Sequence, residues 1–294
     1  MMNKLITHQL LFIIFILFFL GAKATIKFDD SSLSYLIWIA LFFISSVGVS
    51  HGALDGKLIW NGVSKNFEKL ILLGIYLILV LLGLALWIFY PVIGLMLLLT
   101  MAVFHFGNAD LKLFKLNDVN VKLSWGFTVT FLPILFKKDT VELIFYNLIG
   151  FNLPDTFIAI IYCILVLSIF RIYWVILNNI IKSNENNICL IDKSVLIFFE
   201  ITLLITLSYF THPFVWFAIY FCGLHGIRSL INSDFNWRID LKWIMIFTLP
   251  VIVFIFFTYG KYWNADVYSI IFPILGSLTI AHMSLPSIIN SIKK

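Results

Sequence analysis

The chain of 294 residues is strongly apolar, with 62% hydrophobic and 12% charged residues, where soluble domains carry about 45–50% and about 25%. The excess runs along the whole length, which excludes a soluble domain with a single anchor and predicts an all-α polytopic membrane protein. The net charge of +5 does not indicate a nucleic-acid partner, because cytoplasmic loops of membrane proteins are enriched in Lys and Arg. We therefore expect a lipid bilayer as the surroundings and no nucleic acid.

Ten apolar segments are long enough, or nearly long enough, to cross a bilayer. In chain order they are 7–24, 33–51, 68–90, 91–108, 121–136, 157–178, 194–211, 213–229, 241–260 and 266–289. Tyr90-Pro91 and Thr211-His212-Pro213 predict tight turns, because proline disfavours helix at the residue before it. Residues 139–156 predict a re-entrant or interfacial segment. The whole predicts one integral membrane domain over 1–294, a bundle of eight to ten transmembrane helices with its main part at 33–290.

The N-terminal 30 residues allow two interpretations. Residues 1–24 have a basic start, an apolar run and Ala22-Lys23-Ala24, which resembles the cleavage site of a signal peptide. The other interpretation is a first transmembrane helix. We favour the helix, because the rest of the chain is also predicted to span the membrane.

The distribution of Lys and Arg predicts the orientation of the helices. With ten spans and a cytoplasmic N-terminus, fifteen of the twenty Lys and Arg residues fall on the cytoplasmic side and five outside. This bias fits the positive-inside rule. Both termini are therefore predicted to be cytoplasmic.

Four of the six histidines fall at one predicted depth. His51, His105, His225 and His282 lie late in spans that run from outside to inside, roughly 12–19 residues or about 18–28 Å from the outer ends. Ionisable residues inside a membrane are costly, so they tend to face one another or a cavity and mark function. Four imidazoles at one level predict a metal site, and imidazole suits iron, copper and zinc. His8 and His212 fall elsewhere, at the N-terminus and in an outer turn.

Polar residues near these histidines are candidates for orienting them. Asp55 lies one helical turn after His51, and Asp110 lies five residues after His105. Metal-bound histidines usually donate their second nitrogen to a carboxylate or carbonyl, and either aspartate suits this role. The alternative is that both are loop residues near the headgroups. The remaining candidates are Glu200, inside the seventh predicted span, and Arg228, three residues after His225.

Four short motifs carry a family resemblance. They are "HGALD" at 51–55, "HFGNAD" at 105–110, "HGIRS" at 225–229 and "AHMSLP" at 281–286. In this order on a polytopic chain they resemble the Brp/Blh family of bacterial β-carotene 15,15′-dioxygenases, from about residue 45 to the end. The resemblance implies an oxidoreductase of the bacterial inner membrane that holds Fe(II) and cleaves β-carotene with O₂ at its central double bond. It implies two all-trans-retinal products that would supply a rhodopsin.

The resemblance also implies the iron ligands and shows one departure. His51, His105 and His225 match motif histidines that the family uses around iron, and His282 matches the fourth motif. Ser229 stands where the family usually has a second histidine of the third motif, which removes an expected ligand. An inactive relative, or one that binds or cleaves another carotenoid, is therefore an alternative. A metal or proton transporter and a haem-binding membrane protein are further alternatives, because intramembrane histidines serve both.

Overall fold

The computed structural model describes residues 2–25, 30–48, 54–114, 118–182, 188–233, 235–259 and 268–292. Across these ranges the regular structure is helical and contains no strand, which confirms the predicted all-α class. The chain forms two compact units, which we describe separately. Unit 1 comprises Met1–Leu41, Ala102–Ile144 and Asn152–Ser233, and unit 2 comprises Phe42–Met101, Phe145–Phe151 and Asp234–Lys294.

The predicted spans correspond to helices. Within the described residues, eight helices are long and apolar enough to cross a membrane: Lys4–Thr25, Asn66–Phe89, Pro91–Leu111, Val119–Phe136, Asp155–Ile181, Lys193–Phe210, Pro213–Asn232 and Tyr268–Ile292. The second predicted span is a shorter apolar helix, Leu33–Gly48, and the ninth is helix α12, Trp237–Tyr259. A polytopic helical membrane protein is thereby confirmed, while its orientation stays a prediction.

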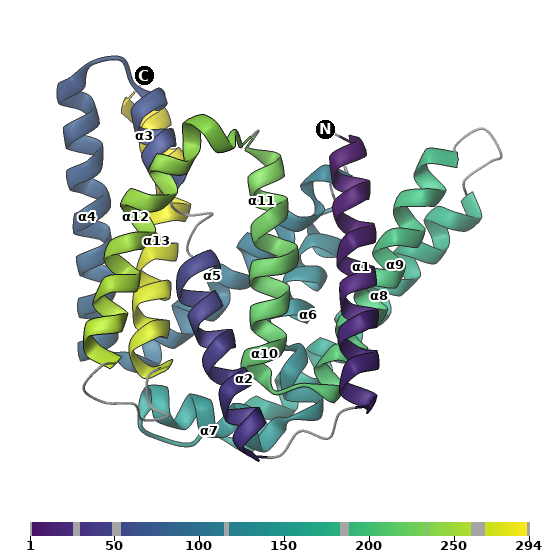
Figure 1. The fold of residues 1–294 in the computed structure, drawn as a ribbon. Coiled ribbons are helices and arrows are strands. Elements are labelled where there is room, and N and C mark those ends of the chain that lie inside the picture. Colours follow the sequence, from purple (N-terminus) through teal and green to yellow (C-terminus); the bar gives the residue numbers. More distant parts are fainter. Residues whose placement is uncertain are drawn as a thin grey trace. The chain divides into compact units, whose positions relative to one another are not determined.

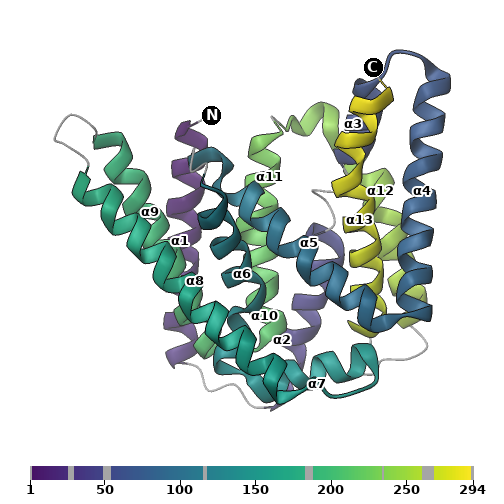
Figure 2. The same cartoon turned by 180° about the vertical axis from the view of Figure 1, so that it is seen from behind.

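Unit 1 is built around α8 (Asp155–Lys182), which packs against α6 (Val119–Phe136) and α9 (Ile188–Phe210). Figures 1 and 2 show α8 and α9 side by side. The N-terminal helix α1 (Met2–Thr25) packs against α9. Most of α2 (Asp30–Phe43) and the second half of α5 (Pro91–Leu111) also belong to this unit.

The eighth predicted span is one helix with an irregular middle. It starts as α10 (Pro213–Ala218), continues as a π-helical stretch, η4 (Ile219–Gly226), and ends as α11 (Ile227–Asn232). His212 caps its start, because the ring Nδ1 accepts the Phe214 N–H at 3.3 Å, and Pro213 occupies the first helical position, where a missing N–H costs nothing. Thr211-His212-Pro213 is thus the predicted turn. π-helical turns are rare and often mark functional sites, and this one carries His225.

Helices α5 and α6 of unit 1 cross with their backbones in contact. A Cβ added at Gly107 would lie 2.0 Å from the Lys122 carbonyl oxygen, and one at Gly126 would lie 1.8 Å from the Val103 carbonyl oxygen. Only glycine fits at either position. Small residues allow this kind of approach between membrane helices, and the crossing fixes the end of α5 that carries His105 and Asp110.

Unit 2 centres on α4 (Asn66–Phe89) and α13 (Tyr268–Ile292), which pack along each other and lie side by side in both views (Figures 1 and 2). Their contact includes the buried residues Leu72 and Leu285. The first half of α5 follows α4 directly, and Pro91 starts it as predicted. A π-helical stretch, η1 (Ile44–Gly48), packs against α12.

Two short helices complete the described chain. Helix α3 (Asp55–Gly62) packs against α4, α12 and α13, and the sequence reasoning did not predict it. Helix α7 (Lys138–Ile149) occupies the region predicted to be re-entrant or interfacial. It is too short to span, since a membrane helix needs about 20 residues, and it shows an exposed Leu143 beside a buried Val141 and Ile144.

Candidate functional site: two carboxylate–histidine pairs

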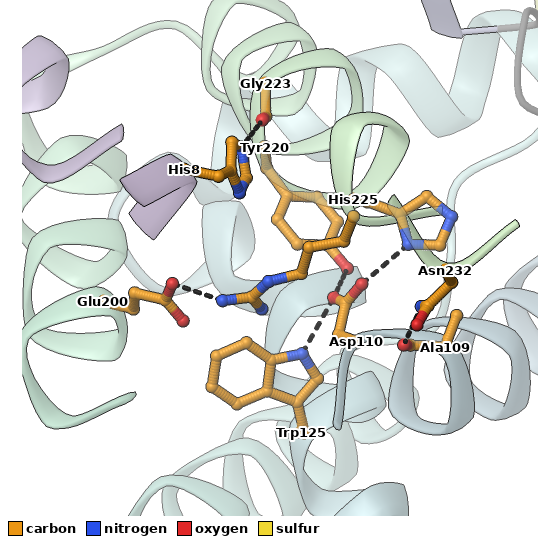
Figure 3. Close-up of polar contacts among 10 residues, drawn as sticks. His8, Ala109, Asp110, Trp125, Glu200, Tyr220, Gly223, His225 and Asn232 are labelled. Carbon is orange, nitrogen blue, oxygen red and sulfur yellow. Dashed lines mark hydrogen bonds and ion pairs between the residues drawn. The ribbon is translucent and has the colours of Figure 1, made fainter. Parts of the chain in front are cut away.

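Asp110 is the centre of the polar cluster in unit 1. Its Oδ1 accepts the Nδ1–H of His225 at 2.8 Å, and its Oδ2 accepts the Trp125 indole N–H at 3.0 Å and the Tyr220 hydroxyl at 2.8 Å. Figure 3 shows these three bonds converging on one carboxylate. All four side chains are fully buried. A buried charge is tolerated when hydrogen bonds satisfy it, and three donors hold this carboxylate in one orientation.

The bond to Asp110 fixes the chemistry of His225. Because a carboxylate can only accept, Nδ1 must carry the proton, and Nε2 is the nitrogen with a lone pair for a metal. Metal-binding histidines are usually oriented in this way. The prediction that Asp110 orients a histidine at this depth is consistent with the geometry, although its partner comes from α10–η4–α11 and not from its own helix.

His105 lies beside His225. Their ring centroids are 5.0 Å apart with an interplanar angle of 66°. An imidazole nitrogen sits about 2.0–2.1 Å from a bound metal, so two imidazoles at adjacent positions of one ion have centroids about 4.5–5.2 Å apart. Two axial ligands of a haem need about 6 Å, with the macrocycle between them. The spacing of the two rings is therefore compatible with a shared non-haem metal, and imidazole ligands suit zinc, copper, iron and nickel alike.

A buried ion pair lies next to this cluster. Arg228 Nη2 donates to Glu200 Oε1, and the Gln9 amide donates to the same oxygen at 3.1 Å. Glu200 and Gln9 are fully buried, and Arg228 is 1% exposed. The Arg228 charge also interacts with Asp110. One guanidinium thus offsets two buried carboxylates, and removing it would leave both uncompensated.

Unit 2 contains a second pair of the same kind. Asp55 Oδ1 accepts the Nδ1–H of His282 at 2.7 Å, and the Tyr76 hydroxyl bonds to the Asp55 carboxylate. Asp55 is 2% exposed and the His282 side chain 24%. Here too the bond makes Nδ1 the protonated nitrogen and leaves Nε2 with the lone pair.

Helix α3 is anchored by an ion pair that sets the position of Asp55. Lys57 Nζ donates to Asp240 Oδ2 at 2.7 Å, and the Asn236 backbone N–H donates to the same oxygen at 2.9 Å. Burial alone would raise the pKa of Asp240, but these bonds outweigh it, so the pKa lies below its usual value. The carboxylate therefore stays charged at neutral pH and fixes the first turn of α3 against α12.

The predicted four-histidine set is brought together only in part. His105 and His225 are neighbours in unit 1, His282 belongs to unit 2, and His51 lies outside the described residues. Among the residues that the structure describes, no three His, Cys, Asp or Glu side chains converge in a way that could hold a metal. The shared four-histidine site stays a prediction, as does the pairing of Asp55 with His51. Ser229, the departure from the family pattern, is half-buried on α11.

Four residues of the unit 1 cluster were missed by the sequence reasoning. Tyr220 and Trp125 bind Asp110, Gln9 binds Glu200, and His8 Nε2 donates to the Gly223 carbonyl at 2.9 Å. Tyr and Trp are abundant in this chain, so their presence alone gave no signal. His8 was placed at the N-terminus of the chain, apart from the four histidines of the predicted site.

These features define a class of protein. Within the described part of the chain, eight apolar helices have spanning length, and each unit contains a histidine whose Nδ1 is bonded to a buried carboxylate. That combination describes a polytopic helical membrane protein in which buried carboxylates orient histidine side chains.

Comparison with known proteins identifies the family. The sequence profile of the β-carotene 15,15′-dioxygenases matches residues 42–290, and the chain belongs to this family. A relative from uncultured marine bacterium 66A03, named beta-carotene 15,15′-dioxygenase, is 29% identical over 216 residues, covering 68% of this chain and 70% of that protein. No solved structure matches the chain. The resemblance carried by the four motifs is thereby confirmed.

Proposed function

We propose that this protein is a non-haem iron dioxygenase that cleaves β-carotene at its central double bond. The bond breaks, and each of its two carbons takes one oxygen atom of O₂, so that two all-trans-retinal molecules form and no external reductant is consumed. The observation that carries the proposal is the Asp110–His225 pair beside His105, in a chain of this family. We propose a rhodopsin as the acceptor of the retinal and a bacterial inner membrane as the location.

Each residue of the proposed site has a role that follows from its chemistry. Bound iron(II) supplies a redox-active centre with open positions for O₂. His105 and His225 would hold it as neutral imidazoles, and His51 and His282 are proposed as the other ligands. Asp110 keeps Nδ1 of His225 protonated and the ring in place, and Asp55 does the same for His282. The Glu200–Arg228 pair balances the charge around Asp110.

The apolar substrate explains why the site lies inside the membrane. β-Carotene has no polar group, so it must be positioned by the shape of an apolar pocket, and it can enter from lipid without crossing water. Holding the double bond in place supplies much of the rate. A water-poor site also limits side reactions of activated oxygen.

The direct test is a retinal assay on purified protein. Protein in detergent, loaded with Fe(II) and supplied with ¹⁸O₂ and β-carotene, is expected to give two ¹⁸O-labelled retinals per carotene. His225→Ala should abolish both iron retention and turnover, whereas His212→Asn, which changes a histidine of the turn before α10, should change neither. Iron-loaded protein that yields no retinal would count against the proposal.

Ser229 supports one alternative function. It lies four residues after His225 on the same helix, where the family usually has a histidine, so this chain could bind a carotenoid without cleaving it or cleave a different one. Ser229→His separates these cases. If the variant gains activity that the natural protein lacks, the natural protein is a binding relative. If both are active, a serine at this position is compatible with turnover.

A further inference from the structure

The N-terminal helix contributes buried polar side chains to the unit 1 cluster, although it lies outside the family match at 42–290. His8 is 9% exposed and Gln9 fully buried, on a helix whose Leu11 is 60% exposed. Buried polar groups within a membrane are costly, so they mark positions with a function or a specific partner. In α1 both polar side chains face α9 and η4.

His8 contacts the π-helical turn that carries His225. Its Nε2 lies 2.9 Å from the Gly223 carbonyl oxygen, so Nε2 must be the protonated nitrogen. The Ile227 N–H, which an α-helix would direct to Gly223, bonds the Leu224 carbonyl. In a π-helical turn each carbonyl has a different N–H partner from the one it has in an α-helix. His8 donates to the Gly223 carbonyl of this turn, two residues before His225. Figure 3 shows this bond beside the Asp110 cluster.

Two further contacts fix α1 on the same side of the cluster. Gln9 donates to Glu200 Oε1, the oxygen that also accepts from Arg228. The Phe12 ring lies against Gly223, where an added Cβ would be 3.2 Å from Phe12 Cε2. Three side chains within about one turn of α1, those of His8, Gln9 and Phe12, therefore contact the segment Gly223–Arg228 or its partner Glu200.

We propose that α1 is a positioning element of the metal site, in which His8 holds the π-helical turn that aims His225 and Gln9 holds the carboxylate that binds Arg228. His8 acts through the backbone of η4 and touches no substrate. The inference rests on the proposed function and adds residues outside the region that defines the family. It requires that residues 2–25 remain in the mature protein.

The test compares two substitutions of His8 with a control on the same helix. His8→Leu removes the donor, while His8→Gln keeps an amide N–H that can reach the same carbonyl. Leu11→Ala changes a lipid-facing side chain of α1. Full-length variants are titrated with Co(II), as a spectroscopic substitute for Fe(II), and assayed for kcat and KM. Intact mass establishes whether α1 is present.

His8→Leu is expected to weaken Co(II) binding about tenfold, the lower end of the effect of losing an outer partner of a metal ligand, because His8 bonds the η4 backbone and not His225 itself. It should also lower kcat more than it raises KM. His8→Gln should recover most of the affinity, and Leu11→Ala should match the natural protein. Equal Co(II) affinity in His8→Leu and the natural protein would overturn the inference, as would purified protein that lacks residues 2–25.

A metal-independent measurement separates this inference from the proposed function. Hydrogen–deuterium exchange of the peptide 219–232 should be faster in His8→Leu than in His8→Gln. If the natural protein binds no metal, the proposed function fails, and exchange still decides whether His8 holds the turn. If it binds metal but exchange and affinity are unchanged in His8→Leu, only the role of α1 is wrong.

Discussion

Adding one methyl group at Gly107 should separate α5 from α6 and misplace the Asp110–His225 pair. The Cβ of Gly107→Ala would lie 2.0 Å from the Lys122 carbonyl oxygen and 2.7 Å from its carbon. The helices must then move apart by about 1 Å to reach the roughly 3 Å of the shortest tolerated contacts. The Trp125–Asp110 bond, 3.0 Å long between the same helices, would stretch to about 4 Å and be lost.

The expected cost follows from that displacement. Forcing a group into a packed contact costs about 1–3 kcal/mol, and more when backbone has to move. A misplacement of about 1 Å in a catalytic site can lower the rate about 100-fold. Gly74→Ala on α4 is the matched control, because its Cβ meets nothing within 4 Å, and alanine in a helix interior stabilises by up to about 1 kcal/mol.

The assay measures thermal unfolding in detergent and retinal formation for both variants. Gly107→Ala should lose both stability and turnover, and Gly126→Ala, with its Cβ 1.8 Å from the Val103 carbonyl oxygen, should behave alike. A Gly107→Ala protein with the unfolding temperature and turnover of Gly74→Ala would refute the reasoning, because α5 and α6 would then not be in backbone contact.

Three further substitutions test the two buried carboxylates and the His212 cap. Asp110→Asn should lower metal affinity at least about tenfold, measured by Co(II) titration, and unchanged affinity would exclude Asp110 as the partner that orients His225. Glu200→Gln removes the carboxylate that is paired with the buried Arg228 and should cost about 3–5 kcal/mol of unfolding free energy, whereas Glu68→Gln, in a partly exposed pair, should change it by less than about 1 kcal/mol. Burial, and then two nearby lysines, lower the pKa of His212 to about 4. As the pH drops, His212 is protonated in the unfolded chain before it is protonated in the folded one. The free energy of unfolding therefore falls between about pH 6.5 and 4, by about 1 kcal/mol at pH 5 for a partly accessible ring. His212→Asn keeps a capping side chain and should remove this loss in pH-dependent unfolding, and an unchanged pH dependence would assign it to another group.

The spans could be predicted from the sequence because the bilayer imposes one length on every crossing helix. Tyr90-Pro91 and Thr211-His212-Pro213 marked turns that the structure contains, because the backbone restriction of proline is local. The short helix α3 was not predicted, because a helix that does not cross the bilayer need not have a spanning length. Its eight residues, Asp55–Gly62, carry no spanning run, and its stability comes from packing against α4, α12 and α13 and from the Lys57–Asp240 pair.

The sequence indicates which histidines lie at a similar depth better than it indicates which side chains are hydrogen-bonded to them. Depth grouped His105 with His225, and the two rings lie side by side in the structure, because depth depends only on position within a span. Which carboxylate accepts a hydrogen bond from which imidazole depends on how the helices pack. Asp110 and His225 are 115 residues apart in the chain, so sequence spacing does not predict their contact. The same limit concealed His8, whose partner Gly223 is 215 residues away.

Asp55 shows that local spacing does not reveal every partner of a side chain. Four residues after His51, it suggested a partner one helical turn away, a rule that holds only where one helix carries both residues. In the structure Asp55 begins a helix of its own, and its described partner is His282, 227 residues away. Both pairs place a histidine from one helix against a carboxylate from another, each with a tyrosine hydroxyl on the same carboxylate. A carboxylate held from elsewhere in the fold is fixed by the whole packed unit, and is therefore a more rigid support for a metal ligand than a neighbour on the same turn.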